Sequence, residues 1–157
     1  SCTSSHTMEL AGMLMDKGID YSRIVEETYF AKTYNQKQIL GRALLESISM
    51  LEGQVVFSAI RMKDLKFYQV DKKDLDGIVQ ELRSIRGVHT AIFLYEVMPS
   101  TWKVSLRSDE KVDVSSIAAY FGGGGHKRAA GCTMNGDVHD VVNNLTRQIE
   151  EQLKLHV

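Results

Sequence analysis

The sequence has few of the residues and patterns that mark several classes of protein. It contains two cysteines, Cys2 and Cys132, and one proline among 157 residues, which is too few cysteines for a disulfide framework. Its five histidines are scattered and form neither an HxxxH nor an HExxH pair, so we expect no metal site within this chain. No apolar run approaches the roughly 18 residues of a membrane span, and no secretion leader opens the chain. We therefore expect a protein of the reducing cytoplasm that makes no contact with a membrane.

A large excess of one charge is also missing. Lys and Arg number 19 and Asp and Glu number 20, which gives a net charge of -1. This balance excludes a protein that coats long nucleic acids with basic charge, but it leaves room for a local basic site. Hydrophobic residues make up 43% and charged residues 25% of the chain, as is typical of a folded protein with one or two compact units.

The first third of the chain has helical patterns and no strand pattern before Gln54. Helices are predicted over residues 8–17, 20–29 and 36–51. Asp20 is expected to cap the second helix by accepting free amides of its first turn. Two interpretations fit this preamble. The three helices form a small bundle, or residues 1–33 are the tail of another domain and residues 34–53 are a linker helix.

Residues 54–157 alternate between strand and helix patterns. Strands are predicted over residues 55–61, 88–97, 101–108 and 129–134, and helices over residues 76–85, 113–121 and 138–153. Asp76, Asp113 and Asp137 are the expected N-caps of these helices. The alternation predicts an α/β domain with a mixed four- to five-stranded sheet and flanking helices.

Four consecutive glycines, Gly122 to Gly125, are the most informative local feature. A flexible linker is one interpretation. However, the run lies between an apolar helix end and an apolar strand, without the Ser and Pro that usually surround linkers. Glycine permits positive φ and a close approach of backbone to ligand, and consecutive free amides can surround an anion. We favour an anion-binding loop.

The residues after the glycines add positive charge. His126, Lys127 and Arg128 follow directly, and residues 114–136 contain no Asp or Glu. Bound phosphate requires nearby cations and no competing carboxylate. Each of these three side chains, taken alone, is also compatible with an ordinary solvated surface.

The predicted strand over residues 101–108 alternates in polarity. Trp102, Val104 and Leu106 share one face, and Lys103, Ser105 and Arg107 share the other. If the polar face meets the glycine run, Arg107 joins the anion site. The alternative is an exposed polar strand face without a ligand.

Catalytic motifs are missing from the sequence. It contains no Asp-x-Asp, no Asp-His-His, no P-loop and no serine nucleophile elbow. The residues therefore indicate a site that binds a phosphate or a nucleotide without catalysing its conversion.

The segment FGGGGHKRAAG at residues 121–131 resembles the signature of the DHHA1 domain, the substrate-binding domain that follows the catalytic domain of DHH phosphoesterases. Supporting matches are DGIV at 76–79, RSIRGV at 83–88, VSLRS at 104–108 and VDVSSIA at 112–118. The resemblance covers about residues 54–155. TSSHT at 3–7 and LGRAL at 40–44 resemble the end of the DHH domain and its linker helix. The subfamily resembled is the bacterial oligoribonuclease and phosphoadenosine-phosphate phosphatase type, with partial similarity to cyclic-dinucleotide phosphodiesterases and a more distant one to RecJ exonucleases.

This resemblance implies two-metal hydrolysis, usually with manganese, by a DHH domain whose motifs would precede Ser1. We expect this chain to bind substrate, to hold no metal or other cofactor, and to be inactive by itself. The implied partners are a nucleotide or short single-stranded oligonucleotide and the DHH domain of the same chain. A homodimer is left open.

The resemblance also carries substrate-binding roles onto matching positions. Gly122, Gly123, Gly124, Gly125 and His126 would hold the phosphate, and Arg107 and Ser108 would contact phosphate or sugar. Lys127 and Arg128 would bind or lie near the nucleotide, with Arg83 and Arg86 as further candidates at the rim.

The expected activity of the whole protein is hydrolysis of short oligonucleotides, of 3′-phosphoadenosine phosphate, or of both, to nucleoside monophosphates. The alternatives are a nucleic-acid-binding module of a RecJ-like single-strand exonuclease and a cyclic-dinucleotide phosphodiesterase domain. Surfaces that bind long strands use stacked aromatic side chains. Only Trp102, Tyr120 and Phe121 lie near the motif, which favours a compact site.

Overall fold

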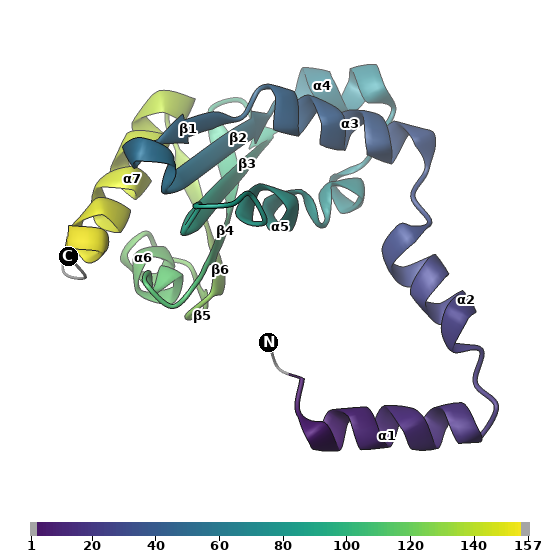
Figure 1. Ribbon diagram of the computed structural model, residues 1–157. Helices are drawn as coiled ribbons and strands as arrows, with labels where there is room; N and C mark the ends of the chain where they lie inside the picture. Colours follow the sequence, from purple (N-terminus) through teal and green to yellow (C-terminus); the bar gives the residue numbers. More distant parts are fainter. Residues whose placement is uncertain (1–2, 155–157) are drawn as a thin grey trace. The chain divides into compact units, whose positions relative to one another are not determined.

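The computed structural model describes residues 3–154 of the chain (Figure 1). Cys2 and His156 lie outside the described residues, as do the outer ends of the predicted domains 1–33 and 54–157. The chain divides into two compact units, Ser1–Tyr34 and Asn35–Val157. Each unit is described by itself.

The first unit consists of short helices without a core of their own. Its elements are α1 (Ser5–Asp16), α2 (Tyr21–Val25) and a π-helical turn (Glu26–Phe30). The Asp20 carboxylate accepts the amide of Arg23 at 2.9 Å, which confirms the predicted cap. None of these helices buries a side chain, so their apolar residues do not form a bundle interior. The choice between a small bundle and a domain tail with a linker helix stays a prediction.

The second unit is an α/β domain. Its helices are α3 (Tyr34–Leu45), α4 (Met62–Tyr68), α5 (Ile78–Arg83), α6 (Val114–Tyr120) and α7 (Val138–Lys154). Its strands are β1 (Ile48–Met50), β2 (Val55–Ile60), β3 (Thr90–Met98), β4 (Thr101–Ser108), β5 (Gly124–His126) and β6 (Ala129–Asn135). Within the described residues these strands form one mixed sheet in the order β1-β2-β3-β4-β6-β5. β2 and β3 run parallel, and all other neighbours are antiparallel.

The sheet has six strands, so the prediction of four or five was wrong. β1 lies inside the helix predicted over residues 36–51, which ends at Leu45. Apolar residues continue at helical spacing past Leu45, but residues 48–50 pair with β2 as a strand, and this pairing overrides the local helical pattern. Leu51 and Glu52 then turn the chain with φ values of 47° and 55°. β5 consists of two glycines and a histidine, which offer no side-chain alternation to read.

Local capping residues show which short-range predictions succeeded. Asp113 accepts the amide of Ser115 at 2.9 Å, and Asp137 accepts that of His139 at 2.8 Å. Both predicted caps are therefore confirmed. Asp76 does not cap α5, because Gly77 occupies the cap position with φ +95°. Asp76 instead ends a 3-10 turn over Lys72–Leu75.

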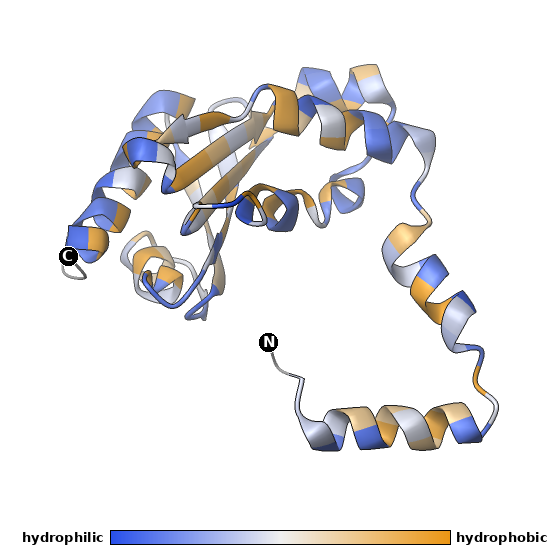
Figure 2. Ribbon diagram, viewed as in Figure 1, coloured by the Kyte–Doolittle hydropathy of each residue, from blue (hydrophilic) through white to orange (hydrophobic). Residues whose placement is uncertain are grey.

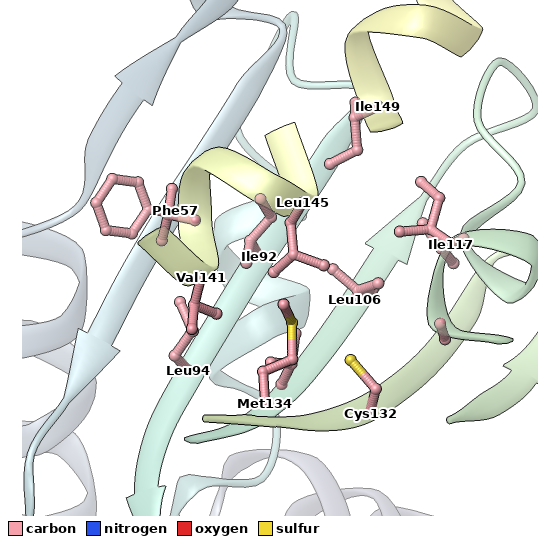
Figure 3. Packing of buried hydrophobic residues seen from close by; sticks show 14 of the residues in the cluster. Phe57, Ile92, Leu94, Leu106, Ile117, Cys132, Met134, Val141, Leu145 and Ile149 are labelled. Atoms are coloured by element: carbon pink, nitrogen blue, oxygen red, sulfur yellow. The ribbon is translucent and has the colours of Figure 1, made fainter. Parts of the chain in front are cut away.

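Helices cover the two faces of the sheet unequally. α6 and α7 pack on one face, where side chains of both helices meet β2, β3, β4 and β6 in the larger core (Figure 3). α3 and α5 pack on the other face over β2 and β3 (Figure 1), and Figure 2 shows β2 as a hydrophobic strand between these layers. Of the described residues, none from β4, β5 or β6 belongs to this second core. Among the described residues of this unit, no hydrophobic core covers that part of the sheet face, which we call the uncovered face.

Candidate phosphate-binding site

The uncovered face is built by the register of three strands. Arg107 of β4 pairs with Ala129 of β6, and Ala129 pairs with His126 of β5. Directly paired residues point to the same face of a sheet. Arg107 and His126 therefore share one face and one row, as expected if the polar strand face meets the glycine run. Their Cα atoms are two strand spacings apart, about 10 Å.

The next row contributes small residues. Ser105 pairs with Gly131, which pairs with Gly124. Ala129 and Gly131 are half-buried, while Gly124 and His126 are exposed. A ligand can thus lie close to the backbone between Arg107 and His126. No local pattern places Ala129 and Gly131 at the site, because their role depends on which strands are neighbours.

Arg107 has an unneutralised charge. Its Nη1 atom donates to the carbonyl oxygen of Leu106 at 3.0 Å. No carboxylate in the described part of the chain lies within ion-pair distance of it, whereas Arg42 and Arg83 both pair with acidic side chains. Arg107 can therefore offer its guanidinium to a phosphate, which it can bind with two parallel hydrogen bonds.

The glycine run differs in part from the expected anion loop. The Gly122 amide donates to Ala119 at 3.0 Å and the Gly123 amide to Ala118 at 2.8 Å. These bonds, with φ +74° at Gly122, end α6 in the manner of many helix C-termini. The amides of Gly122 and Gly123 are therefore not free to bind an anion. The linker interpretation is also wrong, because residues 124–126 pair with β6.

Close strand approach explains several of the glycines. A Cβ atom on Gly123 would overlap the carbonyl oxygen of Gly131, and one on Gly125 would lie 2.5 Å from the carbonyl oxygen of Ala129. A Cβ on Gly131 would lie 2.6 Å from the Val104 carbonyl oxygen. A Cβ on Gly124, as on Gly122, would meet nothing within 4 Å.

Ser108 has a structural role instead of the predicted contact with phosphate or sugar. It alternates with Arg107 and so points to the opposite face of β4. Its hydroxyl is buried and donates to the carbonyl oxygen of Val112 at 2.7 Å. This bond ties the loop before α6 to the strand, and the structure does not present the hydroxyl to a ligand.

Lys127 and Arg128 lie beside acidic residues. Both line a pocket of about 340 Å³ together with Asp109, Glu110 and Asp113. Arg128 Nη2 is 3.9 Å from the Glu110 carboxylate, with both side chains exposed. The expected absence of competing carboxylates was therefore wrong for this pair. The acidic residues precede the acid-free stretch in sequence and fold back against it.

The Asp113 carboxylate, in the same pocket as Lys127 and Arg128, has a lowered pKa. Its pKa is lowered mainly by the hydrogen bond from the Ser115 hydroxyl, partly opposed by burial. The backbone amides of Ser116 and Ser115 add to the lowering, and the charge of Lys127 adds a smaller effect. Lys127 therefore acts on an acidic helix cap in this fold.

Arg83 belongs to a second ionic cluster instead of the phosphate rim. Its Nη2 atom lies 3.4 Å from Asp109 Oδ2, and His89 Nδ1 lies 2.6 Å from the same oxygen. Burial raises the pKa of Asp109, but hydrogen bonds from His89 and the Lys111 amide, with the charges of His89 and Arg83, lower it overall. The cluster secures the end of β4 to α5. Sequence analysis gave no role to His89.

Arg86 is exposed and lies in the turn between α5 and β3. The structure gives it no contact with the uncovered face. It remains a candidate from the family resemblance alone.

Among residues 3–154, no group of three or more His, Cys, Asp or Glu side chains could hold a metal ion. No helix in this part of the chain has the length and apolar character needed to cross a bilayer.

Together, the mixed sheet and its flanking helices define an α/β domain in which Arg107 and His126 share one row of a sheet face. Residues 52–155 match the DHHA1 domain. The chain therefore belongs to the DHHA1 domain family, which confirms the resemblance.

Relatives of this domain include phosphoesterases. The chain is 25% identical over 152 residues to the bifunctional oligoribonuclease and PAP phosphatase NrnA of Thermus thermophilus, a match that covers 96% of this chain and 45% of that protein. An exopolyphosphatase-related protein from Bacteroides fragilis has the same fold with a TM-score of 0.89 and 25% identity, over 98% of this chain and 45% of its own. The chain thus spans less than half the length of these relatives.

A more distant structure shares the fold alone. The pGpG-specific phosphodiesterase PggH of Vibrio cholerae has a TM-score of 0.54 and 12% identity, over 96% of this chain and 52% of its own. The fold of this domain is therefore shared with that phosphodiesterase.

Proposed function

We propose that this chain is the substrate-binding part of a cytoplasmic DHH phosphoesterase. The whole protein hydrolyses short oligonucleotides, 3′-phosphoadenosine phosphate, or both, to nucleoside monophosphates. The observation that carries this proposal is the row of Arg107 and His126 on an uncovered sheet face. The relationship to NrnA supports the choice of substrate class.

The chain's own residues bind and orient the substrate. Arg107 grips a phosphate group with parallel hydrogen bonds, and His126 adds a second donor from across the sheet. Ala129 and Gly131 allow the ligand to approach the backbone between them. These contacts hold the phosphate ester in one position while its other face stays open.

Hydrolysis requires groups beyond those described. A divalent metal, manganese in the family resemblance, would polarise the phosphate and supply a hydroxide for attack on phosphorus. The described residues do not fit such a metal, because they form no cluster of ligands. We assign the metal to a DHH domain of the same protein, and no step of the reaction to residues 3–154.

A compact site fits the surface better than a track for long strands. The residues that β4, β5 and β6 place on the uncovered face, all of them described, include no Phe, Tyr or Trp. Surfaces that bind single strands stack successive bases on such side chains. The RecJ-like alternative predicts affinity that continues to rise with strand length, whereas the compact site predicts affinity that levels off after a few nucleotides.

Isothermal titration calorimetry of the chain with adenosine monophosphate tests the proposal. Arg107→Ala should lower the affinity about tenfold, the value of a charged hydrogen bond, and His126→Ala should lower it less. Arg128→Ala is the matched control, because it removes the same charge beside the acidic loop and should leave the affinity unchanged. Equal binding by wild type and Arg107→Ala, or loss of binding in Arg128→Ala alone, would refute the assignment.

A further inference from the structure

A second cleft adjoins the uncovered face. It has a volume of about 130 Å³ and is lined by Lys103 and Ser105 of β4, Tyr95 of β3, and Lys72 and Asp76 from the segment that leads into α5. Arg107 also lines it. The cleft is therefore continuous with the row that contains Arg107 and His126.

The charge of this cleft is positive. Lys72, Lys103 and Arg107 supply three cations, and Asp76 is the one carboxylate on its walls. Within residues 3–154, neither Lys72 nor Lys103 has a carboxylate oxygen within 4.0 Å, whereas the neighbouring Lys73 reaches Asp71 at that distance. Both ammonium groups are thus available to an anion.

The cations are spread along one strand face. Lys103 and Arg107 are four residues apart on β4, which places their Cα atoms about 13 Å apart. Ser105 lies between them and points to the same side. Tyr95 pairs directly with Lys103, so its hydroxyl adds a neutral donor at the far end. The face presents two groups of donors, one around Arg107 and one around Lys103.

We propose that the cleft is a second anion subsite, in which Lys103 and Lys72 bind a second phosphate group of a ligand already held at Arg107. The inference rests on the proposed function and specifies which ligands the site prefers. Ligands with phosphate groups at two separate positions occupy both groups of donors. A nucleoside monophosphate occupies only the Arg107 end.

The experiment uses calorimetry to compare the binding of two ligands to the chain. They are adenosine monophosphate and adenosine 3′,5′-bisphosphate, which is the compound called 3′-phosphoadenosine phosphate above. Lys103→Ala and Lys72→Ala should each weaken the bisphosphate about threefold to fivefold, as expected for an exposed ion pair, and leave the monophosphate unchanged. Because the contact is an exposed ion pair, the difference in bisphosphate affinity between wild type and each variant should also shrink as the salt concentration rises. Lys63→Ala removes the same charge from α4, outside the cleft, and should change neither ligand.

The outcomes separate the two proposals. If neither ligand binds, or if Arg107→Ala binds both as wild type does, the proposed function fails. If both ligands bind through Arg107 but the two lysine variants weaken neither, or weaken both ligands equally, the second subsite fails and the proposed function stands. Lys103→Gln keeps a long side chain on the strand and, with thermal unfolding curves, excludes a loss of fold as the cause.

Discussion

Gly125 tests how firmly the glycine run is built into the sheet. Its φ is +147°, and a Cβ atom there would lie 2.5 Å from both the Ala129 carbonyl oxygen and the Ala130 Cα. These atoms belong to the backbone of the paired strand, so they cannot rotate away as a side chain would. Gly125→Ala must therefore strain β5 or separate it from β6.

The size of the effect follows from these two routes. Holding a non-glycine residue in such a conformation costs about 1–3 kcal/mol, and forcing an extra carbon into a packed position costs about 1–3 kcal/mol. Separating the three-residue β5 from β6 relieves both, at a loss of a few backbone hydrogen bonds of about 1 kcal/mol each. The loss of stability cannot exceed the cost of separating β5 from β6, so we expect the free energy of unfolding to fall by about 2 kcal/mol.

Urea unfolding followed by the fluorescence of Trp102, the one tryptophan, measures this change. Gly124→Ala is the matched control, since nothing lies within 4 Å of its Cβ position. It should change the stability by about 0.5 kcal/mol or less. Equal midpoints for wild type and Gly125→Ala, or an equal loss in both variants, would show that residues 124–126 are not paired with β6 as described.

Two further predictions concern polar groups near the end of β4. Ser108→Ala removes the buried hydrogen bond to Val112 and should lower the free energy of unfolding by about 1 kcal/mol. Calorimetry should show that the nucleotide affinity of this variant is unchanged. A loss of affinity with unchanged stability would contradict the structural role of Ser108. Asp109 has a lowered pKa in the folded state, so its carboxylate stabilises the fold above its unfolded pKa of about 3.9 and this contribution is lost as the pH falls through the folded pKa. Asp109→Asn should therefore be less stable than wild type at pH 7. In urea unfolding, its free energy of unfolding should also fall less than that of wild type between pH 5 and 2. An equal change of the free energy of unfolding with pH in both proteins would refute this.

Short-range patterns predicted the features that depend on near neighbours. The alternation along β4 is confirmed, because Trp102 is 2% exposed while Lys103 is exposed. The Asp113 cap is confirmed because it needs only amides two and three residues away. Asp76 failed in the same role because Gly77, next to it, adopts positive φ and takes the cap position.

Features that depend on strand order were beyond a local reading. Arg107 and His126 are 19 positions apart, and they share a row only because β6 lies between β4 and β5. No periodicity in either segment encodes that order. Strand alternation predicted that Arg107 would join His126 only if the polar face of its strand met the glycine run, and the family resemblance placed both residues at the site through the segments 104–108 and 121–131.

The acid-free stretch over residues 114–136 shows how sequence proximity can mislead about electrostatics. Its cations divide into two groups once the chain is folded. Lys127 and Arg128, in the turn between β5 and β6, meet the carboxylates of the loop that precedes α6. His126 faces the same side of the sheet as Arg107, where the described residues place no carboxylate within ion-pair distance of that guanidinium. In the proposed site, the face of the sheet that a cation occupies therefore decides whether it can meet an anion, and the number of cations in the motif does not.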